Sequence, residues 1–217
     1  MKQAIFISTL FWILLSCNST DTTNIATDTA TVKEQSDSTV SNAGRQLLIE
    51  DLKRLKSIFA SQDKEKIADL FHFPLSDTIV RIYVNDRTFN KQLEKNGGNI
   101  SRDMFIHFYL QVSESIQIND VNNLFQSINL EDLKRKDSLE YKALIKTEPC
   151  YHFYSIRTEK DLVTLTIGTD ANKDYKSKSI SKDELPGNAS EICEHMLWWV
   201  FQFDGRQLHL KQIAGAG

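Results

Sequence analysis

Residues 197–213 read LWWVFQFDGRQLHLKQI, and this stretch decides the fold. Its first half alternates large apolar residues with others, which is the period of a strand that buries one face. Asp204-Gly205 then favours a two-residue type I′ turn, so the chain should return as a second strand. We therefore predict a C-terminal hairpin whose more apolar face packs on helices. With that turn, the facing pairs are Phe203 with Arg206, Phe201 with Leu208, and Trp199 with Leu210.

The N-terminal part of the domain has helical periodicity. Residues 46–60 place apolar side chains on one helical face and charged side chains on the other. Ser61 and Asp63 offer caps for a short second helix that runs to Leu70. Residues 102–113 predict a third helix. The apolar face of the first helix consists of Leu48, Leu52, Leu55 and Phe59.

The remaining segments favour strands. Residues 78–84 have a strand-like composition, and the second half alternates over 141–147, 151–157 and 161–168. The polar stretch 170–190 contains Pro-Gly and is interpreted as a long loop. Helices followed by strands predict an α+β fold, in which N-terminal helices pack on a curved antiparallel sheet that ends in the C-terminal hairpin.

The first residues have the features of an export leader. Lys2 precedes an apolar run that ends at Leu15 and is too short for a permanent membrane helix. Leu14-Leu15-Ser16-Cys17 resembles the lipobox of bacterial lipoproteins, with a leucine three positions before the cysteine and a small residue just before it. The resemblance implies removal of residues 1–16 and acylation of Cys17, which anchors the protein in a membrane. An ordinary secretory signal with a chance cysteine is the alternative.

A polar segment separates the cysteine from the domain. Residues 17–44 are rich in Ser and Thr and lack aromatic residues, so we expect a disordered tether. A single α+β domain should then occupy residues 45–217. In the lipoprotein family, an Asp after the cysteine often marks inner-membrane retention, and here Asn18 stands there. The resemblance therefore implies a cell-envelope location at the outer membrane and leaves open whether the domain faces the periplasm or the surface.

Charge and motif content limit the partners. The 217-residue chain carries 26 Lys plus Arg and 29 Asp plus Glu, giving a net charge of -3, and no run of clustered cations. We therefore expect no nucleic-acid partner. The chain has no glycine-rich phosphate-binding motif. The run from Glu191 to His195 lacks the second ligand pair of a structural zinc site. We expect neither a cofactor nor a bound metal.

Cys150 and Cys193 are the only cysteines besides Cys17. Export to an oxidising compartment permits them to form a disulfide. Two buried free thiols on different strands are the alternative, because the sequence does not show whether the Cα atoms approach within about 7 Å.

Two phrases, SIFASQDKEKIADLFHFPL at 57–75 and WWVFQFDGRQLHLKQIAG at 198–215, resemble the nuclear-transport-factor-like superfamily. The resemblance implies a cone in which helices pack on a concave sheet and leave a pocket at the wide end. Enzymes of that superfamily often pair an Asp or His base with a Tyr donor inside the cone. The residues that could line such a pocket here are Tyr83, Tyr109, Tyr154 and His195.

Two classes of function fit these features. The first is a lipid-anchored, non-catalytic binding module for a protein or a small-molecule ligand. The second is a small envelope enzyme, an isomerase, dehydratase or hydrolase, that uses the cone-shaped pocket. A deep pocket with an Asp or His near a Tyr would favour the enzyme, whereas a space filled by Phe and Trp would favour the binding module. No residue matches a catalytic motif, so the non-catalytic binding module is the favoured class and the envelope enzyme is the alternative.

Overall fold

A computed structural model describes residues 42–76, 78–144, 148–172 and 193–216, which all belong to one compact unit. The leader, Cys17, the tether up to residue 41 and most of the predicted 170–190 loop lie outside the described residues. The described part is α+β, with helices in its first half and a five-stranded antiparallel sheet in its second. The predicted fold class is confirmed at this level.

The helical half begins with the predicted amphipathic helix, now α1 (Asn42–Ser61), which buries Leu48, Leu52, Leu55 and Phe59. The side chain of Asp63 accepts hydrogen bonds from the first amides of α2 and caps it. The following helices are α2 (Lys64–Ala68), α3 (Arg87–Lys95), α4 (Arg102–His107), α5 (Tyr109–Ser115), α6 (Ile118–Ser127) and the 3₁₀ turn η1 (Leu130–Lys134).

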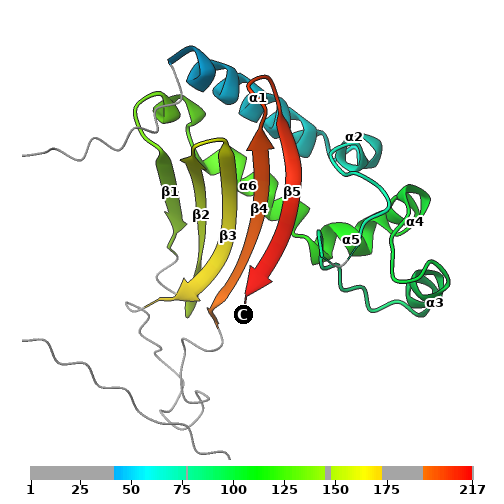
Figure 1. The fold of residues 1–217 in the computed structure, drawn as a ribbon. Helices are drawn as coiled ribbons and strands as arrows, with labels where there is room; N and C mark the ends of the chain where they lie inside the picture. Colours follow the sequence, from blue (N-terminus) through cyan, green and yellow to red (C-terminus); the bar gives the residue numbers. More distant parts are fainter. Residues whose placement is uncertain (1–41, 77, 145–147, 173–192, 217) are drawn as a thin grey trace, which may run out of the picture. The chain divides into compact units, whose positions relative to one another are not determined.

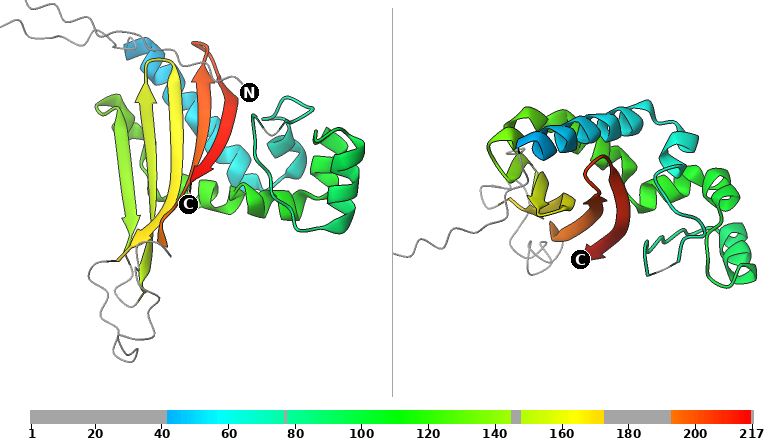
Figure 2. Two further views of the ribbon diagram at one scale, coloured as in Figure 1. Left: turned by 60° about the horizontal axis from the view of Figure 1, so that its bottom comes forward. Right: turned by 45° about the horizontal axis from the view of Figure 1, so that its top comes forward.

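The sheet is a simple meander in which each strand pairs with the next along the chain. Its strands are β1 (Ser138–Ala143), β2 (Cys150–Glu159), β3 (Leu162–Ala171), β4 (His195–Phe203) and β5 (Leu208–Ala216). Figure 1 shows α1 and α6 behind the sheet, whereas α2 to α5 lie beyond its β5 edge. The views in Figure 2 show the same arrangement, with the helices on one side of the strands.

The core lies between the helices and one face of the sheet. The sheet contributes alternate residues of β3 and β4, and Trp199 and Phe201 are fully buried. Trp199 meets Phe59 of α1 edge-on, with 5.4 Å between ring centroids, and lies 5.9 Å from Phe71. Its indole Nε1 donates to the carbonyl oxygen of Ile116 at 3.1 Å. The face predicted to pack on helices is therefore the buried one.

The predicted register of the C-terminal hairpin is wrong. Phe203 pairs with Leu208 and Phe201 with Leu210, so the connection spans residues 204–207. The Asp204 carboxylate explains the longer loop, because its Oδ1 accepts from the backbone amides of both Arg206 and Gln207. A bulge between Val200 and Phe201 shifts the register again, and Trp199 faces Ile213.

Two other predicted elements differ from the structure. Residues 78–84 do not join the sheet as a strand and make a single parallel bridge, from Val80 to Ile213. Their alternation reflects burial of Val80, Ile82 and Val84 in the core, with only that one bridge to the sheet. The predicted 102–113 helix is broken at Phe108, whose backbone leaves the helical region and separates α4 from α5.

Candidate functional site

No described helix covers the face of the sheet opposite the core (Figures 1 and 2). We call it the open face. The alternation of each strand sends Thr164 and Thr166 of β3 to this face, while Val163 and Leu165 enter the core. Trp198 likewise lies on the open face beside fully buried Trp199. The open face is therefore partly polar and partly aromatic.

The strand register aligns four open-face residues in one row across the sheet. Glu140 of β1 faces Ser155 of β2, Ser155 faces Thr166 of β3, and Thr166 faces Trp198 of β4. Directly facing side chains have Cβ atoms roughly 5 Å apart, so the row runs without gaps from β1 to β4. One end presents a carboxylate, the middle presents two hydroxyls, and the other end presents an indole ring.

A surface hollow of about 400 Å³ lies over this row. Its polar lining supplies hydrogen-bond donors and acceptors of several kinds, from hydroxyl, carboxylate and guanidinium groups. Trp198 supplies the aromatic surface. The lining residues are Ser138, Glu140, Ser155, Arg157, Glu159, Leu162, Thr164, Thr166 and Trp198.

The charges of this hollow come from β1 and β2. Lys142 Nζ lies 3.1 Å from Glu140 Oε1, and Arg157 Nη2 lies 3.2 Å from Glu159 Oε2. The hydrogen bond with Glu140 is the main cause that raises the pKa of Lys142. Both ion pairs are exposed to water and contribute little to stability. Their side chains are therefore free to exchange one partner for another.

A second group of aromatic residues lies next to the hollow, where the ring of Phe153 covers Gly168. A Cβ atom on Gly168 would clash with Cε1 and Cζ of that ring, so only glycine fits beneath it. Tyr151 lies beside Phe153, with 6.5 Å between ring centroids, and its hydroxyl donates to Asp170 at 3.0 Å. Burial, followed by this hydrogen bond, raises the pKa of Tyr151. These contacts fix the positions of the Tyr151 and Phe153 rings on the open face.

The structure places the four residues predicted for a cone pocket among different neighbours. Tyr83 is 80% exposed. Tyr109 is partly buried, and among the described residues its hydroxyl has no hydrogen-bond partner. Tyr154 is buried and stacks on Tyr141, and burial raises its pKa. His195 is exposed at the start of β4, with its Nε2 2.7 Å from the side-chain nitrogen of Gln117.

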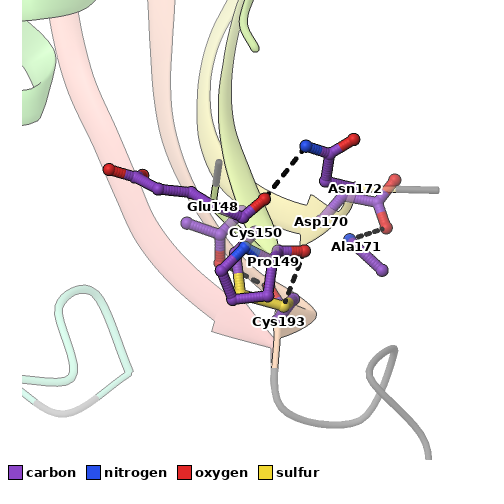
Figure 3. Close-up of a disulfide and its surroundings, with 8 residues drawn as sticks. Glu148, Pro149, Cys150, Asp170, Ala171, Asn172 and Cys193 are labelled. Atoms are coloured by element: carbon purple, nitrogen blue, oxygen red, sulfur yellow. Dashed lines mark hydrogen bonds between the residues drawn. A yellow bond between two sulfur atoms is a disulfide. The ribbon is translucent and has the colours of Figure 1, made fainter. Parts of the chain in front are cut away.

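The other predicted pair, Cys150 and Cys193, forms a disulfide with 5.5 Å between the Cα atoms. Figure 3 shows it at the start of β2, beside Pro149 and the end of β3. Asn172 binds the residues just before β2. Its backbone amide donates to the carbonyl oxygen of Pro149 at 2.7 Å, and its side-chain amide donates to the carbonyl oxygen of Glu148 at 2.9 Å. The disulfide links the first residue of β2 to the segment just before β4, and these two strands flank β3.

The alternation predicted over 161–168 is consistent with Thr164 and Thr166 facing away from the core, but it does not give their partners in the hollow. Glu140, Ser155 and Trp198 come together only through the register of four strands, which no local pattern specifies.

In the part of the chain that the structure describes, no cluster of His, Cys, Asp and Glu could hold a metal ion. None of the described helices has the length and hydropathy that a bilayer crossing requires. Comparison with protein families, curated proteins and solved structures finds no match to this chain.

Proposed function

We propose that this protein is a lipid-anchored protein of the bacterial cell envelope, whose domain binds a saccharide on its open face without catalysing a reaction. The anchor rests on the Leu14-Leu15-Ser16-Cys17 pattern and the Ser/Thr-rich segment that follows it. Acyl chains on Cys17 would hold the protein at the membrane, and the asparagine at position 18 favours the outer membrane.

The observation that carries the binding proposal is the row from Glu140 to Trp198 at the base of the hollow. A sugar ring has one apolar face of C–H groups and an edge of hydroxyls that both donate and accept hydrogen bonds. An indole ring matches the apolar face, while hydroxyls, carboxylates and a guanidinium match the edge. A hollow of about 400 Å³ is within the size range of small-ligand sites.

The packing behind the sheet favours binding over catalysis. A cone-shaped active site would require space between the helices and the sheet. Trp199 occupies that interface and is fully buried against Phe59 and Phe71. We also propose that the domain has the cone-shaped fold of the nuclear-transport-factor-like superfamily. The helices on one face of an antiparallel meander support this proposal. In this chain the ligand would bind outside the cone.

A binding assay with defined envelope glycans tests the ligand. The probes are soluble peptidoglycan fragments and core oligosaccharides of lipopolysaccharide, titrated while intrinsic tryptophan fluorescence and thermal unfolding are followed. We expect one probe to raise the melting temperature of the wild-type protein, and Trp198→Ala to abolish the effect. Leu110→Ala is the matched control, because Leu110 is an apolar residue that is 78% exposed on α5. A glycan that stabilises wild type and Trp198→Ala equally would contradict the site.

The anchor is tested separately. Cells grown with an alkyne fatty acid should label the wild-type protein and leave Cys17→Ala unlabelled. The wild-type protein should sediment with membranes. Any Cys17→Ala protein from which residues 1–16 have been removed should stay in the supernatant. Unlabelled wild-type protein would exclude the lipoprotein assignment without affecting the glycan assay.

A further inference from the structure

The outer edge of β1 is unpaired within the described part of the chain. β1 pairs with β2 on one side only, whereas the opposite edge of the sheet, β5, is partly covered. At that edge the amide of Ile213 donates to the carbonyl oxygen of Ile79 at 2.9 Å. An exposed edge presents free N–H and C=O groups that can pair with another strand.

The register of β1 shows which of its backbone groups are free. The amide of Thr158 donates to the carbonyl oxygen of Asp137 at 2.8 Å, so these two residues form a hydrogen-bonded pair. Such pairs alternate along an antiparallel ladder. Leu139, Tyr141 and Ala143 therefore bond inward to β2. The N–H and C=O groups of Ser138, Glu140 and Lys142 point outward, away from the sheet.

This alternation restricts how two β1 edges can pair across a two-fold axis, because outward-pointing residues must meet each other. If the axis passes at Glu140, glutamate faces glutamate, and if it passes at Lys142, lysine faces lysine. If it passes at Tyr141, Glu140 of one copy faces Lys142 of the other, twice. About four backbone hydrogen bonds would form in this register. Among the registers that pair residues of β1 with one another, only the register centred on Tyr141 sets opposite charges face to face.

The side chains around β1 fit the same register. Tyr141 is 43% exposed and stacks on Tyr154 with an interplanar angle of 6°. Facing residues in a non-hydrogen-bonded pair have their side chains closest together, so the two Tyr141 rings would cover each other. Leu144, which is 57% exposed just past the strand, would lie close to Ser138 of the other copy. The exposed pair of Glu140 and Lys142 would exchange partners between chains.

We propose that two copies of this protein associate through antiparallel pairing of their β1 edges, with Tyr141 at the two-fold axis. The occupant of the edge is a second copy because its Glu140-Tyr141-Lys142 sequence is charge-complementary to itself in that register. The open faces of the two sheets would then continue into one another, which doubles the surface for a repetitive ligand. The dimer itself does not depend on the ligand.

Cysteine crosslinking of the full chain in the host envelope tests the register. The oxidant is copper phenanthroline, which converts two facing thiols into a disulfide. Tyr141→Cys should give a covalent dimer on a non-reducing gel, because facing Cβ atoms of a non-hydrogen-bonded pair lie within disulfide range. Ser138→Cys is the matched control on the same strand, and in this register its two copies lie roughly 20 Å apart. No Tyr141→Cys dimer, or an equal yield for both variants, overturns the proposal.

Charge exchange provides a second test that keeps Tyr141 intact. Glu140→Lys should lower the dimer fraction of the detergent-solubilised chain, measured by sedimentation, by about tenfold because lysines would face each other twice. Lys142→Glu should do the same. Glu140→Lys combined with Lys142→Glu restores opposite charges and should restore the dimer. If wild type is a monomer at every concentration, or if the double variant dimerises no better than the single ones, the β1 interface is excluded.

Discussion

Replacing Trp199 with phenylalanine gives the sharpest test of the core behind the open face. The indole is fully buried, and its Nε1 donates to the carbonyl oxygen of Ile116 at 3.1 Å. Phenylalanine removes that donor and leaves a buried carbonyl unsatisfied, which costs about 1–3 kcal/mol. The lost ring volume also leaves a small cavity, which adds roughly 1 kcal/mol. We therefore expect Trp199→Phe to lower the free energy of unfolding by about 2–4 kcal/mol.

The neighbouring residue offers a matched control with the same chemical change. Trp198 lies on the open face and is only partly buried, so Trp198→Phe should change the free energy of unfolding by about 0.5 kcal/mol or less. The assay is urea unfolding followed by far-ultraviolet circular dichroism, with the disulfide intact. Equal losses in the two variants, or a larger loss for Trp198→Phe, would refute the assignment of the two faces.

Three other contacts of the sheet predict measurable effects. Gly168→Ala would push a methyl group into the ring of Phe153 and should cost about 1–3 kcal/mol in urea unfolding. Removing the Cys150–Cys193 disulfide with paired serines should cost about 4 kcal/mol in the chain-entropy model for a separation of 43 residues, and added reductant should reproduce this loss in the wild type. Hydrogen bonds from the Gln207 amide and from the His209 side chain lower the pKa of Asp204 to about 2. Because the folded pKa is depressed, the stabilisation is complete above about pH 4 and disappears as the pH falls toward 2. The stability difference between wild type and Asp204→Asn should shrink over that range, and a constant difference would contradict the assignment.

Elements with a strong local pattern were predictable from the sequence. The spacing of Leu48, Leu52, Leu55 and Phe59 identified the core face of α1, and the alternation of 161–168 identified β3. α3 was missed because its nine residues are mostly polar and bury only Phe89. Residues 78–84 alternate like a strand, yet they bury their apolar side chains with only one bridge to the sheet. Alternation alone reports burial, and it does not report pairing.

The register of the C-terminal hairpin and the row of residues on the open face depend on interactions that a local sequence pattern does not predict. Asp204-Gly205 favours a two-residue turn, but the Asp204 side chain captures two amides and lengthens the loop. This change and the bulge at Val200 shift every cross-strand pair that follows. The row from Glu140 to Trp198 likewise requires the register of three strand pairs. The alternation of 161–168 could therefore indicate a strand with one buried face, but it could not show which residues lie beside Thr166 on the other face.

Hydroxyl-radical footprinting tests most directly whether the open face is the binding surface in the envelope. The oxidation of Trp198 and Met196, both on the open face of β4, is compared between the protein in its native envelope and the purified protein. Tyr83, which is 80% exposed and whose backbone amide donates to Ser115 at the end of α5, is the internal control. We predict that Trp198 and Met196 are protected in the envelope while Tyr83 reacts equally in both samples. If Trp198 and Met196 are oxidised as readily in the envelope as in the purified protein, the open face is not occupied there and the proposed binding function is wrong.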